Sequence, residues 1–357
     1  MTLSPDWTLQ QDLDQALAGT AALWPALDGA RLFITGGTGF IGCWLLEVLA
    51  HARRQLGTRL DVCVLTRDPA AFQRKAPHLA AMPGLTLLAG DVCGLSPLPW
   101  APTHIIHAAT DASADLNEHN PLRMFDTIVD GSRAVLSLAA RHPGARLLFL
   151  SSGAVYGQQP WELEGVPEDY VGAPDPTVPR NAYGEAKRAA EMLCAIHHKQ
   201  FGVPVVTARI FALLGPYLAL GTHFAAGNFI RNAMAGEPVV VNGNGLPVRS
   251  YLYAGELAQW LLHLLLRGTP GRSYNVGSEH GVSIAALAQE VANVLGDGRI
   301  AVLGAADTGW NPGRYVPDTR RIRAELGLQE EVGLAQAILR TALWNGWCKR
   351  VIVGKAD

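Results

Sequence analysis

The chain has 357 residues, of which 49% are hydrophobic and 17% are charged, and its formal net charge is −2. This length is enough to bury a large core, while the near-neutral charge, without a run of like charges, argues against a nucleic-acid-binding face or a polybasic membrane anchor. No stretch approaches the roughly 20 uninterrupted apolar residues of a membrane span, and the five cysteines lack metal-ligand spacing. The first residues lack the basic-then-apolar order of a secretory signal. We therefore expect a cytoplasmic protein without a secretory signal or a metal site.

The first predicted element is a short amphipathic helix within residues 1–30, which we expect to form an N-terminal extension. Leu9, Leu13 and Leu17 recur at four-residue spacing, which places them on one helix face. We expect this helix to pack on the body of the protein and to contribute stability or dimer contacts rather than chemistry.

From residue 31 onward, short β-like runs alternate with helical stretches. The predicted strands cover residues 31–35, 60–66, 85–88, 104–107, 146–151 and 203–210, and the main predicted helices cover 42–54, 120–141 and 183–200. This alternation predicts an α/β fold of the Rossmann type, a doubly wound parallel sheet with helices on both faces. We expect this domain to span residues 31–211. The shorter, Gly- and Pro-rich segments of residues 212–357 predict a smaller α+β substrate-binding lobe, partly interleaved with it.

A glycine-rich stretch follows the first predicted strand directly. Residues 35–42 read TGGTGFIG. In such a stretch the first glycine makes the tight turn, Gly39 lets the backbone approach a pyrophosphate, and Gly42 lets the helix pack close to the strand. Amides at the helix N-terminus then face the anion. The motif predicts a dinucleotide site contacted by Gly36, Thr38, Gly39, Phe40, Ile41 and Gly42.

The end of the second predicted strand indicates which dinucleotide binds. Enzymes that use NAD normally place an acidic residue there, against the adenine ribose hydroxyls. Here Thr66 and Arg67 come first, and a hydroxyl followed by a guanidinium suits a 2′-phosphate. We expect NADP(H) to be favoured and NAD(H) to remain possible, because Asp68 could swing toward a ribose. Asp91, after the third strand, is expected either to contact the adenine or to be a solvated turn residue.

Three further residues form a predicted catalytic set. Tyr183 and Lys187 are four residues apart in YGEAK, so they share one helix face. A tyrosine near its reference pKa of about 10 is a poor base at pH 7, but a nearby lysine and a positive nicotinamide favour the phenolate. Ser152, at the end of the fifth strand, is placed to hydrogen-bond the substrate oxygen that Tyr183 protonates or deprotonates.

Together these residues resemble the extended short-chain dehydrogenase/reductase family, in its NAD(P)-dependent sugar-nucleotide epimerase/dehydratase branch. The resemblance covers residues 31–327 and includes GDV at 90–92, HAA at 107–109 and SSGAVYG at 151–157. Residues 179–253 are especially similar to UDP-glucuronate decarboxylases. The resemblance implies cofactor contacts at Val92, Ala108 and Ala109. It implies substrate contacts at Thr110, Ser152, Asn228, Arg249 and Arg314, of which the last three would hold a nucleotide diphosphate.

Departures from the family pattern bear on the reaction. Dehydratases of the branch place Asp-Glu after the catalytic hydroxyl residue, and decarboxylases place Glu at the second of those positions. The matching residues here are Gly153 and Ala154, which do not titrate. Elimination of water needs an acid/base pair beyond the tyrosine, so we expect no 4,6-dehydration. Asp111 is the nearby carboxylate that could substitute, although a turn-capping role fits it better.

We therefore expect an NAD(P)-dependent enzyme that transfers a hydride at a ring carbon, C4, of a nucleotide-linked sugar, foremost as a 4-keto reductase. A 4-epimerase and a decarboxylase- or dehydratase-like enzyme are the alternatives within the family. A non-catalytic NADP-binding regulator is the alternative from another class, and the presence of Ser152, Tyr183 and Lys187 argues against it. The expected partner is the nucleotide-sugar substrate, with no nucleic acid and no membrane.

The resemblance also implies a homodimer. In relatives, the helices that correspond to residues 120–141 and 183–200 pair across a two-fold axis in an isologous contact. We expect Leu136, Leu138, Met192 and Ile196 to supply the apolar face of that contact.

Overall fold

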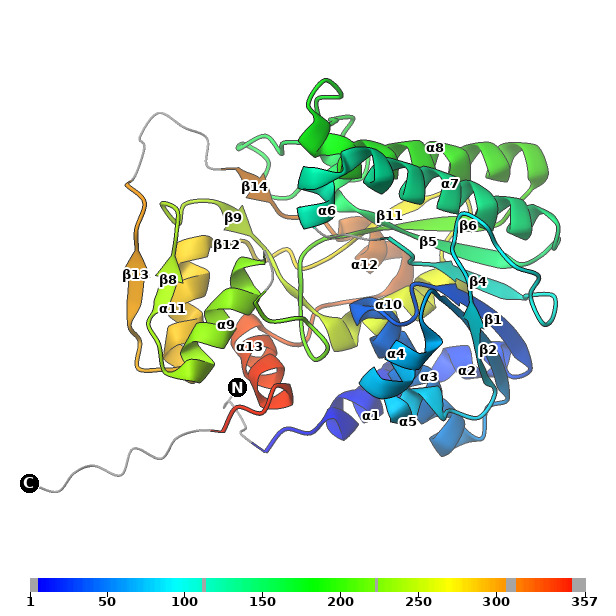
Figure 1. The fold of residues 1–357 in the computed structure, drawn as a ribbon, viewed down its shortest axis with the longest axis horizontal. Helices are drawn as coiled ribbons and strands as arrows, with labels where there is room; N and C mark the ends of the chain where they lie inside the picture. Colours follow the sequence, from blue (N-terminus) through cyan, green and yellow to red (C-terminus); the bar gives the residue numbers. More distant parts are fainter. Residues whose placement is uncertain (1–5, 111–113, 222–223, 306–312, 349–357) are drawn as a thin grey trace, which may run out of the picture.

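The computed structural model describes residues 6–110, 114–221, 224–305 and 313–348 (Figure 1). Its central feature is a seven-stranded sheet in the order β11–β6–β5–β4–β1–β2–β3, in which every neighbouring pair is parallel. The strands are β1 (Ala30–Thr35), β2 (Leu60–Thr66), β3 (Leu85–Ala89), β4 (His104–His107), β5 (Arg146–Ser152), β6 (Val205–Ile210) and β11 (Ser273–Val276). The predicted doubly wound sheet is confirmed, and β11 is a seventh strand that the sequence analysis did not identify.

Helices cover both faces of this sheet (Figure 1). The long helices α7 (Pro121–Ala140) and α8 (Ala182–Phe201) pack side by side on one face, and α3 (Phe40–Leu56) and α10 (Ala254–Arg267) pack on the other. Along β1, Phe33 enters the α7–α8 core, whereas Leu32 and Ile34 enter the α3–α10 core. This follows from the period-2 alternation of side chains along a strand. Both faces are therefore apolar, as a parallel sheet requires.

The N-terminal segment forms α1 (Leu9–Gly19), a 3-10 turn η1 (Ala21–Leu23) and α2 (Trp24–Leu27). The predicted amphipathic helix is confirmed, and it packs on α3 and α10. Asp12 is buried on its inner face, where Arg340 Nη1 donates a hydrogen bond to it at 2.7 Å and the Tyr253 hydroxyl also donates to it. This buried ion pair ties the start of the chain to its last helix, α13 (Leu334–Trp344).

The chain after residue 211, where we predict a smaller lobe, adds further strands and helices. It contains three small sheets, β12–β9–β14, β13–β8 and β10–β7, and the helices α9, α11 and α13 (Figure 1). Its elements are β7 (Leu213–Leu214), α9 (Ala225–Ala235), β8 (Val239–Val241), β9 (Val248–Arg249), β10 (Leu252–Tyr253), β12 (Val282–Ser283), α11 (Ile284–Leu295), β13 (Ile300–Val302) and β14 (Arg314–Tyr315). Within the same stretch, β11 joins the large sheet and α10 packs on it. The domain division at residue 211 stays a prediction.

Short helices complete the described chain. They are α4 (Pro69–Lys75), α5 (Pro77–Ala80), α6 (Ala114–His119), η2 (Gly153–Tyr156), η3 (Pro179–Asn181) and α12 (Arg320–Leu326). None of the helices in the described ranges is both long and apolar enough to cross a membrane.

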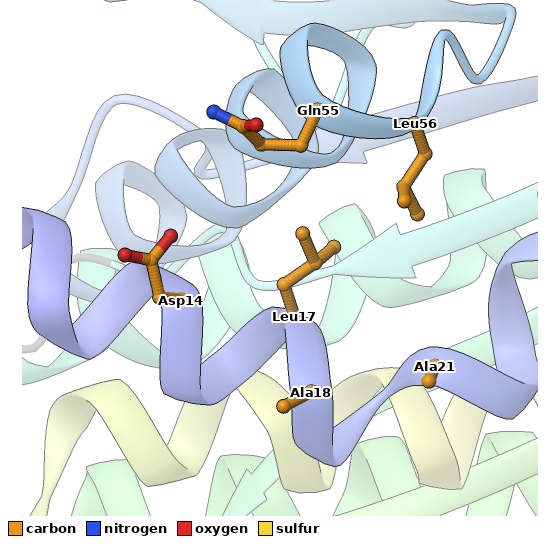
Figure 2. Close-up of a pocket in the computed structure, with 6 residues that line it drawn as sticks. All are labelled: Asp14, Leu17, Ala18, Ala21, Gln55 and Leu56. Carbon is orange, nitrogen blue, oxygen red and sulfur yellow. The ribbon is translucent and has the colours of Figure 1, made fainter.

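A surface hollow of about 370 Å³ lies between α1 and α3 (Figure 2). Its lining residues are Asp14, Leu17, Ala18, Ala21, Gln55 and Leu56. Gln55 and Leu56 are the last residues of α3, whereas the glycine-rich stretch ends in the first turn of that helix. The hollow is therefore remote from the predicted cofactor site.

Candidate active site

The glycine-rich stretch connects β1 to α3 and is closely packed. Gly36 has φ of +73°, a conformation that favours glycine, and a Cβ there would lie 2.6 Å from the backbone of Ala108. A Cβ on Gly42 would lie 2.4 Å from the backbone of Gly37. Gly39 caps α3, and a Cβ on it would meet only the Gly36 carbonyl oxygen, at 3.3 Å. The N-terminus of α3 is thus open to an anion at Gly39, which fits a dinucleotide pyrophosphate.

The carboxyl end of β2 lies beside this loop. Asp68 is the N-cap of α4, and its Oδ1 accepts a hydrogen bond from the Ala71 amide at 2.9 Å. The Asp68 amide donates to Thr66 Oγ1 at 3.3 Å, and Arg67 is exposed. Lys75, at the end of α4, donates from Nζ to the Thr38 carbonyl oxygen at 2.8 Å. Lys75 is a second cation at this rim that the sequence analysis missed, because only the fold of α4 brings it to the loop.

Asp91 and Val92 follow β3. Asp91 is exposed, and its Oδ1 accepts a hydrogen bond from the Cys93 amide at 2.9 Å, which is the geometry of a turn-capping aspartate. Val92 is buried against Gly131 of α7, where a Cβ would lie 2.8 Å from the Val92 side chain. The adenine contact expected of Asp91 and the cofactor contact expected of Val92 stay predictions.

The turn after β4 is fixed by a buried hydrogen-bond network. Thr35 Oγ1 accepts from the Ala109 amide at 3.1 Å and lies 2.7 Å from His107 Nδ1, and His107 Nε2 lies 3.1 Å from Ser132 Oγ. Burial, with a smaller effect of Lys187, lowers the pKa of His107 to about 3. The neutral ring therefore holds the 108–110 turn in place against the glycine-rich stretch. Asp111, the candidate carboxylate beyond this turn, lies outside the described residues.

Lys187 is buried between the end of β5 and this turn. Its Nζ donates to the Leu150 carbonyl oxygen at 2.7 Å and to Thr110 Oγ1 at 2.8 Å. It also lies 5.9 Å from the centroid of the Tyr183 ring. Burial lowers the pKa of Lys187 to about 7, although Glu191 opposes this. The structure therefore brings Tyr183, Lys187 and Thr110 together, and the catalytic and substrate-binding roles expected for them stay predictions.

Ser152 is the last residue of β5, and its hydroxyl lies between two phenols. Ser152 Oγ accepts a hydrogen bond from the Ala154 amide at 3.2 Å and lies 3.3 Å from the hydroxyl of Tyr315. Burial raises the pKa of Tyr183, and hydrogen bonding by Ser152 partly opposes that rise. Tyr315 is a neighbour of Ser152 that the sequence did not predict, because it comes from the distant strand β14.

Behind this group, an ion pair links α8 to β6. Both carboxylate oxygens of Glu191 accept hydrogen bonds from Arg209, and the shortest joins Arg209 Nη2 to Glu191 Oε2 at 2.7 Å. Glu191 Oε1 also accepts from Ser151 Oγ at 2.6 Å. Arg209 Nη1 also donates to the Tyr156 hydroxyl at 2.8 Å. Glu191 is one helical turn after Lys187, so its position on the same helix face was readable from the sequence. The ion pair fixes α8 against β6, and the Ser151 hydrogen bond fixes it against β5, the strand that carries Ser152.

Gly153 and Ala154 form the turn after Ser152. A Cβ on Gly153 would lie 2.6 Å from Phe211 Cζ and 2.8 Å from the Tyr315 hydroxyl oxygen. A longer side chain at this position would have to displace both rings. The lack of a carboxylate here is therefore matched by a lack of space for one.

The three predicted diphosphate ligands lie in the smaller lobe, and the structure does not bring all of them together. Arg249 lies on β9 with its guanidinium carbon 5.8 Å from the Tyr315 ring centroid, on the side of the catalytic set. Asn228 lies in the first turn of α9 and is partly exposed. Arg314 instead stacks on Trp161, 4.7 Å from its ring centroid, and contacts the Glu164 carbonyl oxygen at 3.4 Å. The three ligand roles stay predictions.

Comparison with known proteins places this geometry in a family. The sequence pattern of the NAD dependent epimerase/dehydratase family matches residues 32–277. UDP-glucuronic acid decarboxylase 1 of Xenopus tropicalis is 32% identical over 315 residues, which cover 88% of this chain and 72% of that protein. UDP-glucuronic acid decarboxylase 3 of Arabidopsis thaliana is 29% identical over 86% of each chain.

Solved structures share the fold. A UDP-glucose 4-epimerase from Thermotoga maritima, with UDP-glucose, superposes with a TM-score of 0.74 and 19% identity over 88% of this chain and 98% of that chain. DesIV, a dTDP-glucose 4,6-dehydratase from Streptomyces venezuelae with NAD bound, gives a TM-score of 0.76 and 24% identity over 88% of this chain and 97% of that chain.

Proposed function

The chain belongs to the NAD dependent epimerase/dehydratase family and is an enzyme of it, and on that premise we propose that it transfers a hydride at C4 of a nucleotide-linked sugar, as a 4-keto reductase. One observation carries the choice of reaction. Ser152, Tyr183 and Lys187 lie together at the carboxyl end of β5, whereas Gly153 beside them is closed off by Phe211 and Tyr315. The site thus has the groups for proton transfer at one oxygen but no carboxylate at this turn for a second proton transfer.

The chain's own residues divide the chemistry as follows. Tyr183 gives or takes the proton at the substrate oxygen, and the Ser152 hydroxyl donates a hydrogen bond to that oxygen. Lys187 favours the phenolate form of Tyr183 by its charge. A bound nicotinamide supplies or accepts the hydride. The glycine-rich stretch would hold the pyrophosphate, because Gly36, Gly39 and Gly42 leave the N-terminus of α3 open.

We further propose that NADP(H) is the preferred cofactor, although solved relatives bind NAD. Asp68, the acidic residue that follows β2 and Arg67, is engaged as the N-cap of α4. Arg67 and Lys75 supply cations at the same rim, and guanidinium and ammonium groups suit a 2′-phosphate. The substrate would be a nucleotide sugar, with Arg249 on its diphosphate.

Decarboxylation is the second candidate, because the most similar proteins named above are UDP-glucuronic acid decarboxylases. Oxidation of a uronic acid at C4 gives a β-keto acid. A β-keto acid can lose CO₂ with less acid/base help than dehydration needs. A 4-epimerase would use the same three residues while retaining NAD.

One set of incubations separates these reactions. The purified protein is given NADPH with UDP-, dTDP- or GDP-linked 4-keto-6-deoxy sugars, and separately UDP-glucuronate with NAD⁺, and UDP-glucose with NAD⁺. We expect oxidation of NADPH with a 4-keto sugar, followed at 340 nm. Release of CO₂ from UDP-glucuronate, or formation of UDP-galactose, without any 4-keto reduction would replace the reductase assignment with the corresponding alternative.

A further inference from the structure

Tyr315 reaches the catalytic end of β5 from the smaller lobe. β14 pairs in parallel with β9, and the register places Tyr315 opposite Arg249, so the two side chains share one face of that sheet. The Tyr315 ring packs on Phe211, with 4.6 Å between ring centroids, and the Arg249 guanidinium lies 5.8 Å from the Tyr315 centroid. The ring is therefore held from two sides, with its hydroxyl oxygen 3.3 Å from Ser152 Oγ.

The Ser152 hydroxyl has a single proton to donate and two phenols beside it. It interacts with Tyr183 and with Tyr315. A phenol keeps its proton at neutral pH, and burial raises the pKa of Tyr315 further, so the Tyr315 hydroxyl can donate to Ser152 Oγ. Its other acceptor, the Ile210 carbonyl oxygen, is farther away at 3.5 Å. Donation from Tyr315 to Ser152 leaves the Ser152 proton available for Tyr183 or for a substrate oxygen beside it.

We infer that Tyr315 is a positioning residue, whose hydroxyl donates to Ser152 and thereby fixes the Ser152 hydroxyl as a donor toward Tyr183 and the substrate oxygen. The inference rests on the catalytic roles proposed for Ser152 and Tyr183. This position of Tyr315 also explains why residue 153 is a glycine, because the Tyr315 hydroxyl occupies the space that a side chain there would need. The titratable and charged groups that face Tyr315 are Tyr183, Arg249 and Tyr156, and Lys187 faces Tyr183.

The direct test is a nuclear magnetic resonance measurement on the whole protein labelled with ¹³C at tyrosine Cζ. The chain has eight tyrosines, so the Tyr183 signal is assigned as the one lost in Tyr183→Phe. Tyr315→Phe keeps the ring and removes only the hydroxyl. We expect it to shift the Tyr183 signal in the same direction as Ser152→Ala does, and to cause no further shift in the Ser152→Ala background.

Tyr170→Phe is the matched control, because Tyr170 packs on the same aromatic cluster as Tyr315. It should leave the Tyr183 signal in place. The inference is wrong if Tyr315→Phe leaves the Tyr183 signal unchanged, or if it shifts that signal equally with and without Ser152. This readout needs no substrate, so it decides the role of Tyr315 even if the proposed reaction is incorrect.

Kinetics provide the second readout. Loss of one hydrogen bond in the set should lower kcat about five- to tenfold, with KM and the cofactor Kd unchanged, and Tyr315→Phe should add nothing to Ser152→Ala. A loss of kcat that persists without Ser152 would contradict the positioning role. The absence of turnover of any nucleotide sugar by the unmodified enzyme would count against the proposed function instead.

Discussion

At the scale of single residues, burial makes the charged forms of Lys187 and Tyr183 depend on each other. Burial raises the pKa of the Tyr183 phenol and lowers that of Lys187 to about 7. Each group therefore favours its neutral form when alone, and a phenolate next to an ammonium offsets the cost of both charges. Lys187 is also hydrogen-bonded to Thr110 and to Leu150. Its loss should disturb the cofactor side of the site as well as the chemistry.

The first prediction concerns these two residues. Tyr183→Phe should lower kcat by about 10² or more and leave the cofactor Kd nearly unchanged, because only proton transfer is removed. Lys187→Ala should lower kcat and weaken cofactor binding together. Steady-state kinetics and calorimetric titration with NADPH measure both quantities. Full activity of Tyr183→Phe on the true substrate would rule out the mechanism proposed for this site.

The second prediction concerns cofactor choice. NADP(H) should bind at least several-fold more tightly than NAD(H), and Arg67→Asp should reverse or erase this preference, because a carboxylate repels a 2′-phosphate and accepts from ribose hydroxyls. Arg54→Asp is the control, since Arg54 is an exposed arginine at the far end of α3. Calorimetry that shows tighter NAD binding to the unmodified protein would contradict the prediction.

At the scale of elements, α10 begins with a carboxyl group that is buried in the core. Glu256 is 3% exposed, and its Oε1 accepts from the Val332 amide at 2.9 Å and from the Glu331 amide. Its Oε2 is buried without a hydrogen-bond partner among the described residues. Burial accordingly raises the pKa of Glu256 from 4.5 to about 7.

This pKa predicts a pH-dependent stability. Between pH 4.5 and 7 the folded protein keeps a proton on Glu256 that the unfolded chain has released. The contribution of Glu256 to the free energy of unfolding therefore falls as the pH rises through this window, by about 3 kcal/mol at most. The free energy of unfolding of Glu256→Gln, measured by urea unfolding, should therefore rise relative to that of the unmodified protein as the pH is raised from 5 to 8. Glu237→Gln, at an exposed position, should show no such trend. The same trend in both variants would refute the assignment.

The elements differ in how far the local sequence predicts them. The strands from β1 to β6 were predictable because buried parallel strands are continuous apolar runs bounded by turns. β11 was missed because SYNV contains two polar residues and because this edge strand pairs only with β6, which is distant in the sequence. The glycine-rich stretch, Tyr183, Lys187 and Ser152 were found because each belongs to a local motif. Tyr315 and Lys75 were not, because tertiary packing brings them to the site and no spacing in the sequence records it.

At the scale of the whole molecule, α7 and α8 lie together on the outside of the sheet (Figure 1). Two of the four residues expected at the dimer contact are misassigned. Leu136 and Leu138 are 1% and 7% exposed and belong to the core against the sheet, because they lie on the inner face of α7. Met192 and Ile196, one turn apart on α8, are 62% and 38% exposed. In the predicted contact, the exposed apolar residues therefore come from α8, together with Leu122 at the start of α7.

The last prediction is that the protein is a homodimer through this face. An exposed methionine and isoleucine on adjacent turns form an apolar stripe, and a two-fold axis would bury each stripe against its copy. Multi-angle light scattering at micromolar concentration should give twice the chain mass of 38.1 kDa. Met192→Glu with Ile196→Glu should give monomers, because like charges would face each other across the axis. Leu56→Glu, at an exposed leucine on the opposite face of the sheet, should leave the dimer intact. A monomer in the unmodified protein would refute the dimer, and a dimer that survives the double substitution would place the interface elsewhere.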